Sequence, residues 1–358
     1  MDINQEIRFC TSFDGVQLAT ARYGKGPTLV KAANWLTHIE SDTHSPHTRQ
    51  WIDELSRHHS FITYDKRGCG LSDRNAKEIS LDAWVRDLEA VVDSFKLERF
   101  PLLGISCGGA IAVAYAAKHP ERVSHLILFG SYSTSYLSTE KTDPQILETA
   151  ETLLKVVRLG WGNGGAAFRQ VFVSKFFPHA SSEQQRDFDE YQRITATPEM
   201  AEKCLRAMFS INVREQARKV RCPTIIFHAR GDQLVTFDQG RKLASLIPQA
   251  RIVPVESDNH VPLGGEPCWD HITKEIRDFL GVTEISSPPS YKLTARQTEV
   301  LQQVAAGQTD KQIAKLLNLS PRTVEMHVAA SMKTLSSTTR AEAVHIATQQ
   351  GLLGKLQT

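Results

Sequence analysis

The stretch that decides the fold is Phe100–Gly109, FPLLGISCGG, in which an apolar run leads into a serine flanked by glycines. Gly104 and Gly108 lie two residues before and two residues after Ser106. A Gly-x-Ser-x-Gly turn between a strand and a helix is too tight for side chains at the glycine positions, and it holds the serine hydroxyl at the carboxyl edge of a sheet. The stretch therefore predicts a nucleophile elbow. The alternative is a glycine-rich turn with an incidental serine.

Short β-type runs alternate with helical patterns along the first 280 residues. The predicted strands are Thr28–Val30, Phe61–Tyr64, Phe100–Leu103, Ser124–Phe129, Thr224–His228 and Arg251–Val255. The predicted helices include Leu81–Phe95, Gly108–Lys118, Phe237–Leu246 and Pro267–Leu280. This alternation predicts an α/β domain with a doubly wound, mostly parallel sheet. Residues 131–221 interrupt it with charged, helical sequence, which predicts a helical cap over the working edge of the sheet.

Composition narrows the class of protein. The chain has 358 residues, enough for one large and one small domain, of which 41% are hydrophobic and 23% charged. No apolar stretch approaches the roughly 18 residues of a membrane span, and the polar start MDINQEIRFC does not resemble a signal peptide. We therefore expect a cytoplasmic protein without a membrane partner. The six cysteines lack the spacing of disulfide frameworks and zinc sites, so we expect no metal and no cofactor.

Charge and proline content divide the chain. Of its 42 Lys and Arg and 40 Asp and Glu, eight and four respectively lie from Tyr291 onward, so this segment carries +4 and the rest −2. That asymmetry favours an anionic partner for the C-terminal segment. Residues 281–290, GVTEISSPPS, cannot continue a helix or a central strand and predict a short linker. We therefore expect an α/β domain over 1–280, the linker at 281–290 and a small domain over 291–358.

The serine needs partners, because a hydroxyl at its ordinary pKa is a weak nucleophile without a base oriented by an acid. After this kind of elbow the partners follow in the order acid, then histidine. Asp232 turns out of the fifth predicted strand, and His260 follows the sixth. Ser106, Asp232 and His260 are therefore the predicted catalytic triad. Asp238 and Asp258 are rival acids, although neither directly ends a strand.

The segment Tyr64–Ser72, YDKRGCGLS, together with the elbow and its predicted partners, closely resembles the α/β-hydrolase family over roughly residues 10–280. The resemblance implies a Ser-His-Asp site beneath a cap that sets substrate choice. It also implies an oxyanion hole built from two backbone amides, those of Cys107 and Trp35. The family's usual His-Gly pair is replaced here by Asn34-Trp35, whose bulk we expect to narrow the pocket or weaken transition-state binding. A serine at the elbow argues against dehalogenase and epoxide hydrolase chemistry and leaves ester, thioester, lactone, amide and some carbon–carbon cleavages open.

Three helix starts follow the linker. They are marked by two capping boxes and one N-cap before proline: Thr294 with Gln297, Thr309 with Gln312, and Ser320 with Pro321. Only Asn318-Leu319 separates the second helix from the third, which is typical of a helix-turn-helix. Residues Arg340–Gln349 predict a fourth helix. A four-helix protein-interaction module is the alternative to a DNA-binding domain.

This segment closely resembles the LuxR-type DNA-binding domain. The matching residues are Leu293-Thr294, Glu299-Val300-Leu301, Ala306-Gly307, Lys311–Ala314, Leu319-Ser320, Thr323-Val324, His327-Val328 and Arg340–Ala343. The resemblance implies that Glu325, Met326 and Ala329 face the major groove. It assigns contacts with the DNA backbone to Thr309, Lys311, Ser320, Arg322, Thr323 and Lys333. So few basic residues predict weak monomer binding and hence a homodimer on a two-fold site, with Arg340–Gln349 as its interface.

These features lead to a functional hypothesis: a transcriptional regulator whose α/β domain binds a small apolar or ester-like molecule in a Ser-His-Asp pocket. Ligand binding must favour one of two arrangements of the protein if it is to act as a signal. Whether Ser106 also hydrolyses the ligand slowly is left open. The rival hypothesis is a serine hydrolase of esterase or lactonase type that uses the C-terminal domain to dimerise or localise. A third is an α/β scaffold that binds only protein.

Overall fold

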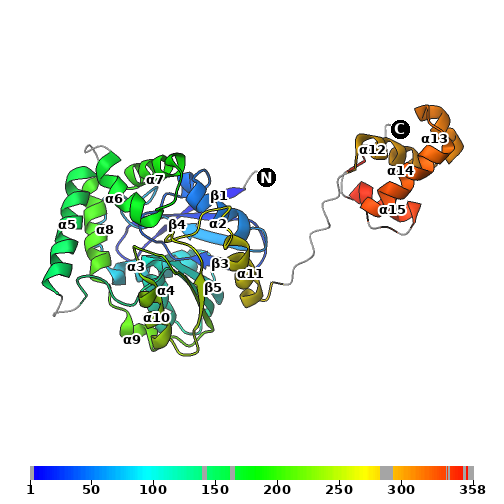
Figure 1. Ribbon diagram of the computed structural model, residues 1–358. Coiled ribbons are helices and arrows are strands. Elements are labelled where there is room, and N and C mark those ends of the chain that lie inside the picture. The colour runs from blue at the N-terminus through cyan, green and yellow to red at the C-terminus, as the bar shows by residue number, and fades with distance from the viewer. Residues whose placement is uncertain are drawn as a thin grey trace. The chain divides into compact units, whose positions relative to one another are not determined.

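The computed structural model (Figure 1) describes residues 4–138, 143–161, 166–282, 293–335, 337, 339–349 and 352–353, without the side chains of residues 166–169 and 349. The chain divides into two compact units, Met1–Val282 and Thr283–Thr358, here called the first and the second unit. Residues 283–290 of the predicted linker lie outside the described residues.

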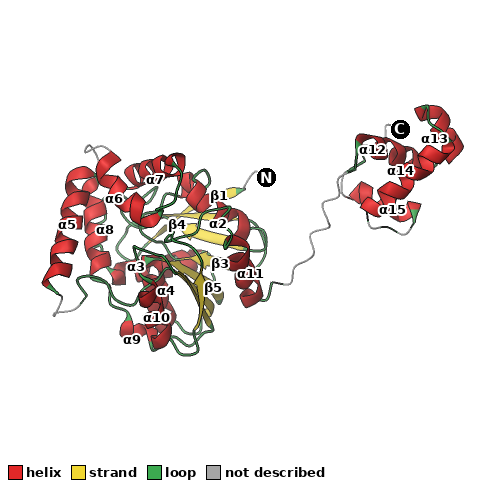
Figure 2. Ribbon diagram, viewed as in Figure 1, coloured by secondary structure: helices red, strands yellow, loops and turns green. Residues whose placement is uncertain are grey.

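Eight strands of the described residues form one sheet in the first unit, in the order β1-β2-β4-β3-β5-β6-β7-β8 (Figure 2). Their bounds are β1 Gln5–Thr11, β2 Gln17–Tyr23, β3 Thr28–Lys31, β4 Ser60–Tyr64, β5 Phe100–Ile105, β6 Val123–Phe129, β7 Thr224–Ala229 and β8 Arg251–Val255. Strands β1 and β2 are antiparallel to their neighbours, whereas β3 through β8 run parallel to one another. The carboxyl ends of the parallel strands therefore meet at one edge, where side chains from distant parts of the sequence converge.

Helices cover both faces of this sheet (Figure 1). Those outside the cap are α1 Ile39–Asp42, α2 Pro46–Leu55, α3 Leu81–Ser94, α4 Cys107–Lys118, α10 Phe237–Leu246 and α11 Trp269–Leu280. Trp84 of α3 and Ile111 of α4 belong to one buried cluster, and Trp51 of α2 and Ile272 of α11 belong to the other. Because both faces are covered, β7 is buried along its whole length and reads in the sequence as a continuous apolar run.

A helical cap lies between β6 and β7 in the sequence. Its helices are α5 Pro144–Gly160, α6 Ala166–Phe176, α7 Ser182–Thr195, α8 Pro198–Phe209 and α9 Arg214–Ala217. An isolated β-bridge between Thr134 and Asn212 joins the start of the cap to its end. Trp161 and Phe188 bury their rings in the same cluster as α3 and α4. The cap is therefore packed onto the sheet domain and shares its core.

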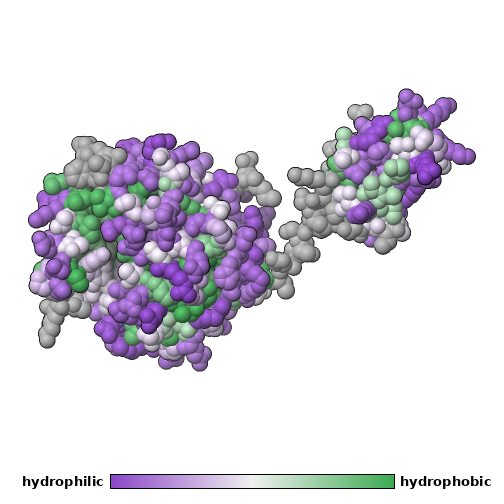
Figure 3. Space-filling model, viewed as in Figure 1, coloured by the Kyte–Doolittle hydropathy of each residue, from purple (hydrophilic) through white to green (hydrophobic). Residues whose placement is uncertain are grey.

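Figure 3 shows a mostly hydrophilic visible surface, with apolar residues gathering over part of the cap. On α5 of the cap, Ile146, Leu147 and Leu159 are exposed. Among the helices that the structure describes, none is long and apolar enough to cross a membrane.

Four helices form the second unit: α12 Ala295–Ala305, α13 Asp310–Leu317, α14 Pro321–Thr334 and α15 Arg340–Gln349. Capping boxes at Thr294 and Thr309 and the N-cap Ser320 begin the first three. Asn318 adopts the left-handed conformation, φ 53°, at the end of α13, which allows the tight turn into α14. One small core, including Val300, Ile313 and Val328, holds α12, α13 and α14 together.

The predicted fold class is confirmed in both units. All six predicted strands are present, with bounds that shift by at most two residues, and the helices predicted at 237–246 and 340–349 have the predicted bounds. Sequence reasoning missed the antiparallel hairpin β1–β2 and the helices α1 and α2 that follow β3.

Candidate functional site

The serine turn lies where β5 ends and α4 begins. Ser106 has a left-handed backbone conformation, φ 54° and ψ −127°, and is the N-cap residue of α4. A Cβ placed on Gly104 would lie 2.6 Å from Gly109 Cα, and one on Gly108 would lie 3.0 Å from the carbonyl oxygen of Ala32. Larger residues at the two glycine positions would therefore force the turn apart. The strained serine, itself 3% exposed, has the geometry expected of a nucleophile elbow.

Asp232 and His260 are brought together although 28 residues separate them. Asp232 Oδ2 lies 2.7 Å from His260 Nδ1, and Asp232 Oδ1 accepts the backbone amides of Leu234 and Val235 at 2.8 and 2.9 Å. Burial alone would raise the pKa of Asp232, but the charge and hydrogen bond of His260, with the Val235 amide, hold it below its ordinary value. An ionised Asp232 fixes Nδ1 of His260 as a donor, which leaves Nε2 of the neutral ring as an acceptor.

His260 Nε2 is buried and has no hydrogen-bond partner among the described residues. The ring lies beside Gly130, the residue after β6, whose hypothetical Cβ would be 2.9 Å from His260 Cε1. Since the Ser106 amide donates to the carbonyl of Phe129 at 2.8 Å, the serine turn and the histidine lie at neighbouring points of the same sheet edge. No hydrogen bond joins Ser106 Oγ to His260 Nε2 in the described structure, and hydrogen bonds of catalytic residues often form fully only with a bound substrate.

The rival acids face elsewhere. Asp258 Oδ2 pairs with His179 Nε2 of the cap at 2.8 Å, and Asp238 pairs with Lys242 at 2.8 Å on the surface of α10. His228, in β7, is fully buried and uses Nε2 to contact the carbonyl of Val235 at 2.8 Å. Only Asp232 among the three candidate acids therefore contacts His260 in the described structure.

The amides predicted for an oxyanion hole belong to segments that pack closely. The contact of Gly108 with Ala32, described above, brings the start of α4, with Cys107, against the loop that leads to Trp35. The Trp35 ring is buried, stacks on Phe172 of the cap at 6.2 Å and meets Trp161 edge-on at 6.0 Å. The bulky side chain that replaces the family's glycine thus fills space under the cap.

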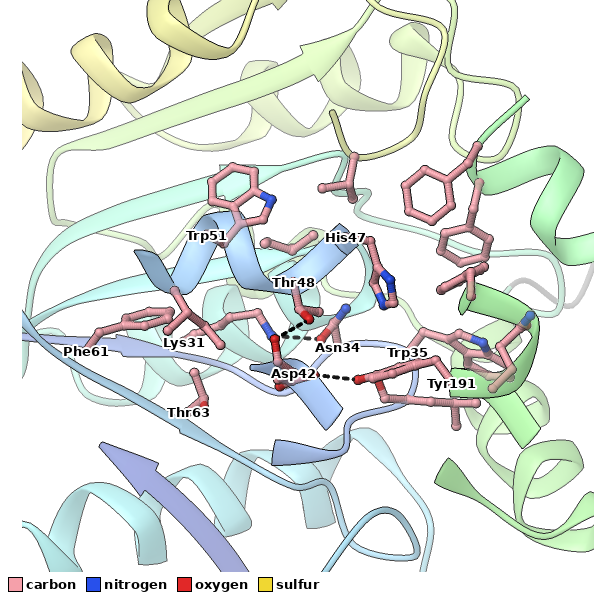
Figure 4. Close-up of a pocket in the computed structure, with 18 residues that line it drawn as sticks. Lys31, Asn34, Trp35, Asp42, His47, Thr48, Trp51, Phe61, Thr63 and Tyr191 are labelled. Atoms are coloured by element: carbon pink, nitrogen blue, oxygen red, sulfur yellow. Dashed lines mark hydrogen bonds between the residues drawn. The ribbon is translucent and has the colours of Figure 1, made fainter. Parts of the chain in front are cut away.

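A cavity of about 60 Å³ lies between the sheet edge and the cap (Figure 4). Its wall is made of Lys31, Asn34, Trp35, Leu36, Asp42, His47, Thr48, Trp51, Ile52, Phe61, Thr63, Ile105, Phe176, Phe177, Phe188, Tyr191, Gln192 and Val261. Ile105 and Val261 are the chain neighbours of Ser106 and His260, which are not themselves part of this wall. Phe176, which lines the cavity, also contacts His260: its ring meets the His260 ring edge-on at 5.3 Å, and its carbonyl accepts the His260 amide at 2.8 Å.

Sequence reasoning missed the polar residues of this cavity. Lys31 ends β3, Asp42 ends α1, His47 lies in α2, and Tyr191 and Gln192 come from α7 of the cap. The Tyr191 hydroxyl donates to Asp42 Oδ1 at 2.9 Å, which links the cap to the sheet domain inside the cavity wall (Figure 4). The one available signal was Lys31 itself, a charged residue directly after the apolar strand Thr28–Val30.

The residues predicted to contact DNA cluster at the start and along one face of α14. Glu325, Met326, Ala329 and Lys333 recur at helical spacing and are all exposed, with Met326 66% exposed. Thr309, Lys311, Ser320 and Arg322 are exposed at the starts of α13 and α14, while Thr323 is half-buried beneath the Ser320 cap. Arg340 joins α15 to α13 through two hydrogen bonds to Asp310, of 2.6 and 2.7 Å.

The parallel sheet, the serine turn, the Asp–His pair and the cap define an α/β domain of the serine-hydrolase class, carried on one chain with a helix-turn-helix unit. The chain belongs to the alpha/beta hydrolase fold family, whose model matches residues 39–266. Residues 291–347 match the model of the bacterial regulatory proteins of the luxR family, which identifies the second unit as a LuxR-type DNA-binding domain.

Curated and solved relatives resemble the first unit. The 2-hydroxy-6-oxo-2,4-heptadienoate hydrolase of Pseudomonas putida is 24% identical over 241 residues, covering 64% of this chain and 77% of that protein. A 2-hydroxymuconate semialdehyde hydrolase of a Pseudomonas species is 36% identical over 122 residues, or 34% of this chain and 38% of that protein. The crystal structure of the enol-lactonase from Burkholderia xenovorans superposes with a TM-score of 0.62 at 22% identity, over 76% of this chain and all of that chain. These likenesses concern the fold of the first unit.

Proposed function

We propose that the protein is a ligand-responsive transcriptional regulator. The first unit binds a small molecule beneath the cap, next to Ser106, Asp232 and His260, and the LuxR-type unit binds DNA as part of a homodimer joined through α15. The observation that carries the proposal is the presence on one chain of a cavity beneath the cap of a hydrolase-type domain and of a DNA-binding unit. A ligand that binds one arrangement of the protein more tightly than another shifts the population between them.

The wall of the cavity supports a role for the cap in this response. It takes side chains from the sheet domain and from α6 and α7 of the cap, and the Tyr191–Asp42 hydrogen bond crosses between them. A ligand in this space touches both parts at once. It therefore stabilises one position of the cap and of the segments packed on it.

The predicted triad adds a hydrolysis reaction to the proposal. In a bound ester, Ser106 Oγ attacks the carbonyl carbon while His260 Nε2 accepts the hydroxyl proton, and Asp232 stabilises the resulting imidazolium. The amides of Cys107 and Trp35 are the predicted donors to the developing oxyanion. Turnover by this route would remove the signal, whereas a site that only holds its ligand would keep it.

The test is DNA binding by the full-length protein as a function of salt, with and without candidate ligands. Binding that weakens steeply with salt and changes in midpoint when a ligand is added is the expected result. A protein that binds no duplex at low salt contradicts the proposal. Sedimentation of the protein–DNA complex at the same salt concentrations tests the homodimer.

The second candidate function is that of a serine hydrolase that uses its second unit to dimerise or localise. The Asp232–His260 hydrogen bond and the hydrolase names of the relatives favour it. Hydrolysis of short acyl nitrophenyl esters by the wild type and by Ser106→Ala distinguishes the two. Rapid turnover that is lost in Ser106→Ala, together with no salt-sensitive DNA binding, selects the enzyme over the regulator.

A further inference from the structure

The cavity wall contains an unusual number of polar atoms without partners. Trp35 Nε1, His47 Nε2, Trp51 Nε1 and both amide atoms of Gln192 are buried and make no hydrogen bond within the described residues. Gln192 is completely inaccessible to solvent. Buried polar groups in folded proteins are nearly always hydrogen-bonded, and an exception indicates a missing water or ligand. The residues that carry these atoms line one cavity, so a single occupant can satisfy several of them.

The wall also contains one lysine, Lys31, and one aspartate, Asp42, which form no ion pair with each other in the described structure. Lys31 Nζ donates to Asn34 Oδ1 at 2.9 Å, and none of the ion pairs formed by the described residues includes Lys31. Asp42, the nearby carboxyl, is engaged by the Tyr191 hydroxyl (Figure 4). Burial lowers the pKa of the Lys31 ammonium and raises that of the Asp42 carboxyl. Burial therefore opposes the charged form of each group, and their mutual attraction offsets this only in part.

The unpartnered atoms are mostly donors. An indole N–H can only donate, and the ammonium of Lys31 retains two further N–H groups after its bond to Asn34. On His47, Nδ1 lies 2.7 Å from Ser45 Oγ, which leaves Nε2 free for the occupant. A wall with an unpaired cation and several donors is complementary to an anion with two or more acceptor oxygens.

We infer that this cavity binds a small organic carboxylate, with Lys31 as its counter-ion and the Trp35 and Trp51 indoles as further donors. The ligand's apolar body packs against Phe176, Phe177 and Phe188, the phenyl rings that the cap contributes to the wall. The inference rests on the proposed function and sharpens the ligand from an apolar or ester-like molecule to one with an acidic head. A volume of about 60 Å³ holds several waters at about 10–15 Å³ each, and the ligand displaces them.

The experiment compares acids with their neutral amides on the full-length protein. Butanoate and phenylacetate are titrated by calorimetry beside butanamide and phenylacetamide, which have nearly the same shape without the charge. We expect each acid to bind at least about tenfold more tightly than its amide, since hydrogen bonds to a charged group are the stronger ones. Equal binding of acid and amide, or no binding of either acid at millimolar concentration, overturns the inference.

Variants assign the effect to the cavity. Lys31→Met removes the charge and keeps the length of the side chain, and Lys25→Met is its matched control at an exposed turn before β3. We expect Lys31→Met to abolish the preference for the acid and Lys25→Met to retain it. Trp51→Phe keeps an aromatic ring but removes one donor, and we expect it to weaken binding of the acid with an unchanged circular dichroism spectrum. Wild-type affinity in both Lys31→Met and Trp51→Phe overturns the inference.

A labelled DNA duplex in the same samples separates this inference from the proposed function. If the acids bind through Lys31 but leave DNA binding unchanged, the carboxylate site stands and the regulatory function is contradicted. If a neutral ligand changes DNA binding while no acid depends on Lys31, the regulatory function stands and the carboxylate site is contradicted.

Discussion

Two cations of the first unit, Arg67 and Lys31, have different surroundings. The Arg67 side chain is fully buried and contacts Asp87, Asp14 and Ser12, with hydrogen bonds of 2.7 to 3.3 Å to all three. It also donates to the carbonyl of Glu78 at 3.1 Å. Lys31, at the cavity, has one hydrogen bond to a neutral amide and no carboxylate partner among the described residues.

This difference distinguishes a charge that stabilises the fold from a charge that is available to bind a ligand. A buried cation is expensive unless other groups compensate it fully, and around Arg67 the fold supplies that compensation itself. Around Lys31 it does not, and the neighbouring indoles and amide are also unpartnered. Groups that the fold leaves unsatisfied are available to a ligand. Stability measurements can test this distinction directly, because loss of the two cations should have opposite effects.

The largest effect is expected for Arg67→Met. The substitution leaves Asp87, itself almost fully buried, without its counter-ion, and breaking a buried pair in this way costs roughly 3–5 kcal/mol. All five tryptophans lie in the first unit, so the change in tryptophan fluorescence during urea unfolding reports on that unit alone. Arg57→Met is the control, because its side chain is 65% exposed and such pairs contribute less than about 1 kcal/mol. Equal effects of the two variants would show that the buried pairs of Arg67 stabilise the protein no more than an exposed pair does.

In the second unit, the basic residues that are predicted to contact DNA lie on the surface. The predicted contacts of Arg322 and Lys333 with phosphates are independent of sequence, so a random duplex suffices to test them. We expect the double variant with alanine at both positions to weaken binding about tenfold, or roughly 1.4 kcal/mol, and to reduce the slope of log affinity against log salt by about 2. Lys315→Ala, an exposed lysine on α13, is expected to leave the slope unchanged. An equal loss in this control would refute the predicted docking face.

Much of the fold could be predicted because the central strands are apolar runs bounded by turn residues. The hairpin of β1 and β2 was missed, since its sequences QEIRFCT and QLATARY mix polar with apolar residues, although only β1 is an exposed edge and β2 is mostly buried. Asp14-Gly15, between these strands, is a hairpin signal that would have identified them. Helix α1 has only four residues, too few to show a helical period, whereas α2 buries Trp51, Ile52 and Leu55 in a helical pattern that was not recognised.

The candidate site likewise has one part that could be predicted from the sequence and another that could not. Asp232 and His260 could be proposed as a pair because each follows a strand, and parallel strands end at one edge. The carboxylate cavity could not be predicted, because its residues come from β3, α1, α2 and the cap, and only the folded chain brings them together. Lys31 in particular looks like an ordinary polar end of a strand, since lysine is usually exposed.

Lys31→Met should change the stability of the ligand-free first unit in the opposite direction from Arg67→Met. Removing a half-buried charge that has no carboxylate partner among the described residues is expected to raise the free energy of unfolding by about 1 kcal/mol, again followed by tryptophan fluorescence in urea. Lys25→Met, at an exposed turn, should leave it unchanged. A loss of stability in Lys31→Met would instead identify Lys31 as a structural counter-charge for Asp42, and Lys31 and Arg67 would then have the same structural role.

The smallest effect concerns the ion pair between Asp310 and Arg340, which is bidentate like that of Arg67 but is partly exposed, at 20% and 44% of the two side chains. The hydrogen bonds from Arg340 lower the pKa of Asp310 below its ordinary value. The pair therefore adds stability above the ordinary pKa of an aspartate, and this contribution is lost as the pH falls through the lower, folded-state pKa. Solvent screening limits it to about 0.5–1 kcal/mol.

Asp310→Asn is accordingly expected to speed hydrogen exchange in α13 and α15 at pH 7, while the difference from wild type shrinks at pH values below the folded-state pKa of Asp310. Arg340→Ala should have a similar effect, and the double variant should add little to either single one, because both remove the same interaction. Additive effects, or a difference that persists in acid, would mean that the pair contributes nothing to stability. In that case an Arg–Asp pair would stabilise this protein only where solvent is excluded, as around Arg67. Burial alone would then explain why the pair in the first unit contributes to stability and the pair in the second unit does not.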